Sequence, residues 1–165
     1  MAEVLLFAPE RAFFSDGAPA ELRYLLNHAL CATDPEAQEA LLLEARQRWP
    51  DEPDVHISLY KFYFVNVRYP AAEAAVWRAL KTGAQLAGFD RNYRRLTPAS
   101  ADWSQRRGAV RLYLFSLKAL GVIRLRRQKV ADARRVLEKL LELDPADEIG
   151  GGSFLHIARS FTEDD

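Results

Sequence analysis

A few residues of this 165-residue chain have side chains that could do chemistry at the spacing where they stand. His28 and Cys31 lie three residues apart, which would place them on one helix face as half of a tetrahedral zinc site. Nothing nearby completes a set of four ligands, and a lone Cys is common in protein cores. Ser153 and His156 have the same spacing but lack a third group to orient the histidine as a base. We therefore predict no catalytic residue, no cofactor and no metal.

A run of three glycines, within DEIGGGSFLHIARS at residues 147–160, is the next candidate. A phosphate-binding glycine loop follows a strand, opens a helix and usually carries a lysine near the start of that helix. This run follows a predicted helix, and no lysine comes after it. We interpret it as a flexible joint before a capping helix that begins near Ser153, a suitable N-cap residue. The residues expected to cover the preceding helix are Phe154, Leu155, Ile157 and Ala158.

Charge is distributed unevenly along a chain whose total formal charge is zero. Residues 1–86 carry a net charge of −4, residues 87–135 carry +10 and residues 136–165 carry −6. Arginines of the basic segment interleave with Tyr93 and Trp103, a combination that can grip single-stranded nucleic acid. The alternative is that these cations end a helix or pair with the acidic segments. Since no recognised nucleic-acid module is present, we do not expect nucleic acid as the main partner.

Composition excludes several classes of protein. Apolar residues make up 49% of the chain and charged residues 28%, an ordinary globular balance for one compact domain. The single cysteine, Cys31, excludes an internal disulfide and fits a reducing compartment. No apolar run approaches the roughly 20 residues of a membrane span, and residues 4–7 are too short for a signal peptide. We expect a cytoplasmic protein that does not contact membranes.

Helical periodicity dominates the chain, and almost nothing has the alternation of a strand. Prolines such as Pro53 and Pro70, together with glycines and Asp/Ser clusters, divide the pattern into short-linked segments. Helices joined by short connections lie antiparallel to each other. The fold class predicted is therefore all-α, with helices at 19–31, 36–48, 53–67, 70–86, 104–127, 129–143 and 152–161.

Small residues at matched positions suggest a repeat. In the segment 130–145, Ala133 and Leu137 share one helix stripe, and an alanine there lets a neighbouring backbone approach closely. Leu120 and Gly121 precede this alanine, and Pro145 follows it. The skeleton resembles the tetratricopeptide repeat, with its pattern W-x2-L-G-x2-Y, then A-x3-F, then P.

The same pattern recurs with a shift of 61 residues and again with a further shift of 34. The middle copy keeps Ala72 and places His56 where the family has a large packing residue, but it has Tyr60 in place of the glycine. The first copy has Gln38 in place of the alanine, and terminal repeats are expected to diverge. The resemblance covers about 100 of the 165 positions, namely the repeats 19–52, 53–86 and 114–147.

The resemblance implies antiparallel helical hairpins stacked as a short right-handed superhelix with a C-terminal capping helix at about 151–161. Residues 19–165 would form this single domain, preceded by an N-terminal arm at 1–18. The 61-residue step leaves an insertion at about 87–113, and its Phe89, Tyr93, Leu96 and Trp103 indicate that it packs against the domain rather than floating free.

Members of the family bind a peptide segment or a helix of another protein in a concave groove, so the expected function is non-enzymatic protein–protein interaction. Apolar anchors beside basic side chains would suit an acidic-hydrophobic partner segment. The residues predicted from helical phase to line the groove are Arg23, Asn27, Ile57, Lys61, Phe64, Phe115, Lys118 and Val122.

Three other possibilities remain open at this level. The aromatic residues of the N-terminal arm could occupy the groove when no partner is bound, so deletion of residues 1–16 would raise partner affinity. The acidic tail of one copy could meet the basic segment of another in a homo-oligomer. The basic region 91–135 could bind nucleic acid or another anion.

Overall fold

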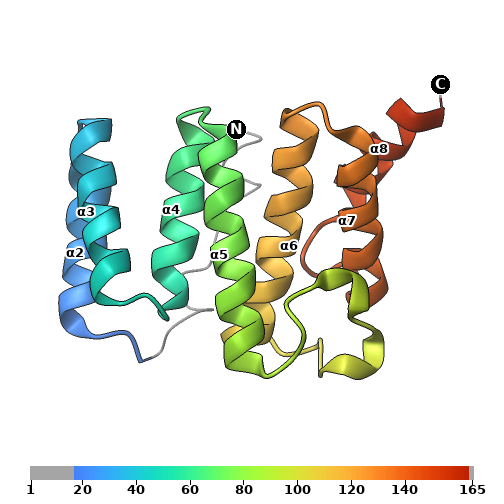
Figure 1. Ribbon diagram of the computed structural model, residues 1–165, viewed down its shortest axis with the longest axis horizontal. Coiled ribbons are helices and arrows are strands. Elements are labelled where there is room, and N and C mark those ends of the chain that lie inside the picture. The colour runs from blue at the N-terminus through green and yellow to red at the C-terminus, as the bar shows by residue number, and fades with distance from the viewer. Residues whose placement is uncertain (1–16, 164–165) are drawn as a thin grey trace.

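The chain folds as a row of helices. The computed structural model describes residues 17–163, and within that range seven α-helices and two short 3-10 helices are present with no strand (Figure 1). The all-α fold class is therefore confirmed for the described part. The elements are α2 (Ala20–Cys31), α3 (Pro35–Arg48), α4 (Pro53–Val65), α5 (Tyr69–Ala87), η2 (Tyr93–Arg95), η3 (Pro98–Ser100), α6 (Gly108–Arg126), α7 (Val130–Leu143) and α8 (Gly152–Glu163).

Local sequence explains most helix ends. Proline occupies the first turn of α3, α4 and α5, where its missing N–H is not needed by the helix. Asp34 caps α3 by accepting a hydrogen bond from the Glu36 N–H at 3.3 Å. Gly88, in the left-handed conformation at φ 84°, ends α5. Six of the seven predicted helices agree with the structure to within two residues at each end.

The predicted start of α6 was wrong by four residues. Ser104 has the residue type of a helix cap, but its N–H and hydroxyl both donate to the Asp102 carboxylate, at 3.1 and 2.5 Å. This local turn competes with helix formation, so the chain continues extended through Arg107 and turns at Gly108 with φ 80°. The helix therefore begins at Gly108 rather than near residue 104.

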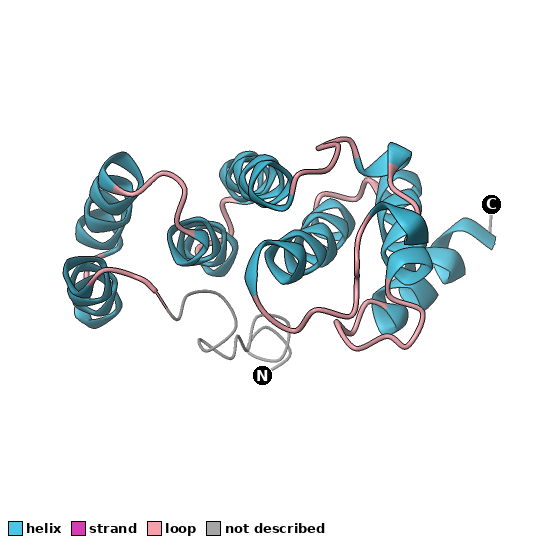
Figure 2. Ribbon diagram, turned by 90° about the horizontal axis from the view of Figure 1, so that it is seen from below, coloured by secondary structure: helices cyan, strands magenta, loops and turns pink. Residues whose placement is uncertain are grey.

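Successive helices form hairpins whose first and second members lie on opposite sides of the molecule. Helices α2, α4 and α6 follow one side, and α3 and α5 follow the other (Figure 2). Each helix packs on the next one in the chain, and α4 also packs on α6 across the hairpin boundary. This arrangement gives one long face made only from first helices.

Small residues lie where the paired helices are closest. Ala72 and Ala133, the matched alanines of the sequence pattern, are both fully buried. Gly121 of α6 faces Leu137 of α7 so closely that a Cβ atom built on it would lie 2.6 Å from Leu137 Cδ2. Small residues at these positions of the sequence pattern therefore permit the close packing of neighbouring helices.

The insertion packs against the domain, as its apolar residues predicted. Phe89 lies between Trp103 and Tyr113, with ring-centroid distances of 5.1 and 4.9 Å. The Tyr113 hydroxyl donates to the Arg91 carbonyl at 3.1 Å, and Leu96 is only 1% exposed. Residues 88–107 thus form an ordered cover over the ends of α5 and α6, and the last part of the insertion lengthens α6.

The C-terminal helix covers α7, although one predicted contact is wrong. Leu155 and Ala158 are buried, whereas Ile157 is 43% exposed and points away from the domain. The first turn is capped by Asp147, whose carboxylate accepts from the Gly152 N–H at 3.1 and 3.3 Å, and Ser153 lies inside the helix. The glycine run permits close packing here, because a Cβ on Gly151 would lie 2.5 Å from Leu140 Cδ2.

Nearly all of the predicted N-terminal arm, residues 1–18, lies outside the described residues, so its proposed docking in the groove stays a prediction. Across residues 17–163, no helix combines the length and the apolar character needed to cross a membrane.

Candidate functional site

The predicted groove residues lie on α2, α4 and α6, the three helices that share one side of the molecule (Figure 2). Arg23 and Asn27 are exposed on α2, and Lys61 is half-buried on α4. The other five residues are buried, with exposures between 1% and 8%: Ile57, Phe64, Phe115, Lys118 and Val122. The eight residues therefore belong to helices of one side, but only Arg23, Asn27 and Lys61 present accessible polar groups. Contact with a partner stays a prediction for all eight.

Lys118 is already engaged by the chain itself. Its ammonium donates to the carbonyl oxygen of Ile149 at 3.0 Å and lies 5.8 Å from the ring centroids of Phe115 and Phe154. Burial lowers the pKa of Lys118, and the nearby carboxylate of Asp147 partly offsets that effect. The side chain thus anchors the loop between α7 and α8, a role that helical phase alone did not indicate.

The candidate metal and catalytic residues have ordinary surroundings. Cys31 is a free, exposed thiol, and the ring of His28 lies 6.1 Å from that of Tyr24. No group of three or more His, Cys, Asp and Glu side chains within residues 17–163 is arranged to hold a metal ion. Ser153 and His156 lie about one helical turn apart in α8.

His56 is a buried packing residue with a polar tether. Its Nε2 atom lies 2.6 Å from the Pro50 carbonyl oxygen and 3.3 Å from the Thr82 hydroxyl. We assign the ring proton to Nε2, because a carbonyl can only accept. Burial lowers the pKa of His56, although the bond to Pro50 acts in the opposite direction. The histidine therefore joins the start of α4 to the preceding turn in its neutral form.

Several cations of the basic segment, residues 87–135, form ion pairs within the chain. Arg124 and Arg127 both form ion pairs with Glu73 of α5, at 3.6 and 3.3 Å, which ties the second hairpin to the third. Further ion pairs of this segment join Arg95 with Asp90, Arg106 with Glu148, Arg134 with Glu138 and Arg135 with Asp132. These pairs favour the interpretation that the cations balance the chain's own carboxylates.

A hollow on α5 is lined by Arg91 of the basic region and by five residues that the sequence patterns did not single out. It has a volume of about 420 Å³ and is lined by Trp77, Arg78, Leu80, Lys81, Arg91 and Asn92. Trp77, Arg78 and Lys81 are separated by helical spacings of one, three and four residues, which bring them together on one side of α5. The sequence signal for this hollow was a tryptophan with cations at helical spacing. The sequence patterns identified these residues only as part of the predicted helix 70–86.

Comparisons with known proteins show a modest similarity to an uncharacterized bacterial protein. The chain is 29% identical over 121 residues to a protein of Azotobacter chroococcum mcd 1 described as an uncharacterized 19.8 kDa protein in nifW 5'region. The match spans 72% of this chain and 68% of that protein. No family model matches the chain, and no solved structure matches it. The similarity exceeds the length of any one hairpin, so the two proteins resemble each other across several hairpins.

Proposed function

We propose that this protein is a tetratricopeptide-like helical repeat module that binds a peptide segment or a helix of another protein on the face formed by α2, α4 and α6. The observation that supports the proposal most directly is the repeated packing of first and second helices through small residues. Ala72 and Ala133 are buried at matched positions, and Gly121 lies against Leu137. Hairpins stacked in this way form a superhelix whose first helices line a continuous surface. The expected role is binding, as a scaffold or adaptor in the cytoplasm, rather than catalysis.

The chemistry of the face favours an acidic partner segment. Arg23 on α2 and Lys61 on α4 contribute two cations, and Asn27 adds an amide that can donate or accept a hydrogen bond. Ile57 and Phe64 of α4 and Val122 of α6 are buried, so an apolar contact with them would require these side chains to become exposed when the partner binds. An amphipathic helix with acidic residues flanking an apolar stripe would match both features.

The test begins with affinity capture of the partner from the native cell, followed by mass spectrometry and mapping of the bound segment. The dissociation constant of that segment is then measured by calorimetry for the native protein, Arg23→Glu and Lys61→Glu. Each reversal should weaken binding by about tenfold or more. Lys129→Glu is the matched control, because Lys129 is exposed in the turn between α6 and α7. Equal affinities for all four proteins would refute binding on this face.

Deletion of residues 1–16 tests the separate prediction about the N-terminal arm. If that segment competes with the partner, the truncated protein should bind the mapped peptide more tightly and take up more of an apolar dye. Unchanged affinity and dye uptake would exclude the competition while leaving the binding face itself in place.

A further inference from the structure

The hollow on α5 is lined by groups suited to an anion that carries a flat ring. Trp77 keeps 38% of its surface exposed, although Arg124 lies 5.7 Å from its ring and Tyr93 lies 6.4 Å from it. Leu80, fully buried, forms the floor below it. The indole and the leucine together give the hollow an apolar wall.

Every charged group in the lining is positive. Arg78 and Lys81 come from α5, and Arg91 comes from the loop that follows this helix. Among residues 17–163, none of these three side chains forms an ion pair, in contrast to Arg95, Arg124 and Arg127. The nearest carboxylate in sequence is that of Asp90, whose pKa is lowered by the Asn92 N–H at 2.9 Å, by Arg95 at 3.4 Å and by the charge of Arg91.

The neutral polar side chain in the lining, that of Asn92, also favours the binding of an anion. The side-chain oxygen of Asn92 accepts from the Arg94 N–H at 3.1 Å, which leaves its amide NH₂ group to face a ligand as a donor. The hollow therefore offers donors from two elements around an apolar wall. The like charges of Arg78, Lys81 and Arg91 repel each other, so a bound anion would relieve that repulsion.

We propose that this hollow is a binding site for a nucleoside phosphate, with the base against Trp77 and the phosphate groups between Arg78, Lys81 and Arg91. A volume of about 420 Å³ lies in the range of small-molecule sites, roughly 300–1,000 Å³. Three cations match more than one negative charge, and phosphate groups accept several charge-assisted hydrogen bonds. The indole supplies the aromatic surface on which a base stacks. The site lies on α5 and its following loop, away from the α2–α4–α6 face.

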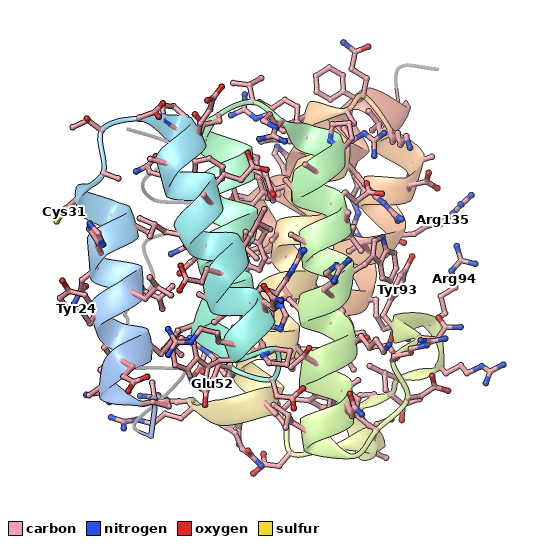
Figure 3. The ribbon with its side chains drawn as sticks, turned by 60° about the vertical axis from the view of Figure 1, so that its left-hand side comes forward. Tyr24, Cys31, Glu52, Tyr93, Arg94 and Arg135 are labelled. Carbon is pink, nitrogen blue, oxygen red and sulfur yellow. The ribbon has the colours of Figure 1, made fainter. Side chains whose placement is uncertain are left out.

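The cations continue beyond the hollow. Arg94 lies 5.9 Å above the ring of Tyr93, and Figure 3 shows Arg94 and Arg135 projecting outward beside that tyrosine. Arg135 is held by Asp132 at 3.1 Å. Arg94 would therefore extend the positive potential at the mouth of the hollow and attract a ligand with a second phosphate group.

The experiment is calorimetric titration of the full-length protein with ADP, adenosine and pyrophosphate. The proposal requires ADP to bind, and adenosine and pyrophosphate to bind at least about tenfold more weakly, because each lacks one half of the recognised chemistry. Binding of pyrophosphate as tight as that of ADP would overturn it, since the ring would then contribute nothing. Absence of ADP binding at millimolar concentration would overturn it as well.

Variants locate the binding. Lys81→Glu and Arg91→Glu should each weaken ADP binding by about tenfold or more. Lys129→Glu makes the same charge change as Lys81→Glu outside the lining of the hollow and should weaken it much less. All three positions are exposed, so the fold should persist. ADP should also quench tryptophan fluorescence in the native protein but not in Trp77→Phe, which keeps Trp49 and Trp103. Equal binding by all variants, or quenching that survives Trp77→Phe, would place the nucleotide elsewhere.

Discussion

At the residue scale, three buried polar side chains each have a defined structural task. His56 joins the first turn of α4 to the Pro50 carbonyl, Lys118 holds the loop at Ile149, and Asp144 accepts from the Glu148 and Ile149 N–H groups. A buried polar group is tolerated when a partner offsets its lost hydration. These residues therefore constrain loops and turns that apolar packing alone would not fix.

The neutral state of His56 makes stability depend on pH. Burial lowers its pKa in the folded protein below 6.5, and within residues 17–163 its Nδ1 has no hydrogen-bond partner that could accept an added proton. The unfolded chain therefore binds a proton first, and the stability that neutral His56 contributes is fully present above pH 6.5. That contribution is lost as pH falls below 6.5, with a slope of up to about 1.4 kcal/mol per pH unit.

Urea unfolding of the native protein and His56→Gln at pH 7.5 and 5.5 measures this effect. From pH 7.5 to pH 5.5, the free energy of unfolding should fall more for the native protein than for His56→Gln. This comparison holds even if the two proteins differ in stability at pH 7.5. His28→Gln, at an exposed position of α2, should keep the native pH dependence. The same loss in His56→Gln as in the native protein would contradict the assignment.

At the scale of elements, the sequence predicted structure best at residues whose type restricts the backbone or the packing in one particular way. Prolines in the first helical turn and the matched alanines predicted the helix starts and the closely packed surfaces of α5 and α7. The start of α6 was missed because Ser104 can cap a helix or bind Asp102, and only the three-dimensional structure decides between them. Helical phase assigned the groove residues to α2, α4 and α6, and their contact with a partner stays a prediction. Phase could not reveal that Lys118 meets a loop 31 residues further along the chain.

The contact between Gly121 and Leu137 should control the pairing of α6 with α7. Gly121→Ala gains about 1 kcal/mol in helix propensity. Its methyl group would, however, lie 2.6–2.7 Å from two Leu137 carbons, and overpacking of this kind costs about 1–3 kcal/mol. We expect a net loss of stability of about 1 kcal/mol and a melting temperature lower by about 2–4 °C.

Thermal unfolding followed by circular dichroism tests the pairing, with Gly83→Ala as the control. A Cβ on Gly83 meets nothing closer than the Ala109 carbonyl oxygen at 3.2 Å, so that variant should be less destabilised. In the double variant Gly121→Ala/Leu137→Ala, the new methyl group should fill part of the cavity, and the combined loss should be smaller than the sum of the single losses. Strictly additive losses would show that the two residues are not in contact.

At the scale of the whole molecule, apolar burial increases from the first hairpin toward the third. Helix α2 contributes three buried residues and α3 two, whereas α6 alone contributes thirteen. Helix α6 packs on α4, α5, α7 and α8, so it forms the centre of the domain. In a stack of hairpins each unit is stabilised mainly by its neighbours. An end hairpin with little buried surface should therefore open without the rest.

Native-state hydrogen exchange should show this gradient directly. Backbone amides of α2 and α3 should exchange through a local opening, and amides in the centre of α6 and α7 only on global unfolding. Leu22→Ala, at a fully buried position of α2, should speed exchange in α2 and α3 while leaving α6 and α7 close to native rates. Leu120→Ala, at an equally buried position of α6, should accelerate exchange throughout residues 53–143. If Leu22→Ala accelerated every helix equally, the domain would unfold as one cooperative unit, and the α2–α4–α6 face would be lost or formed as a whole.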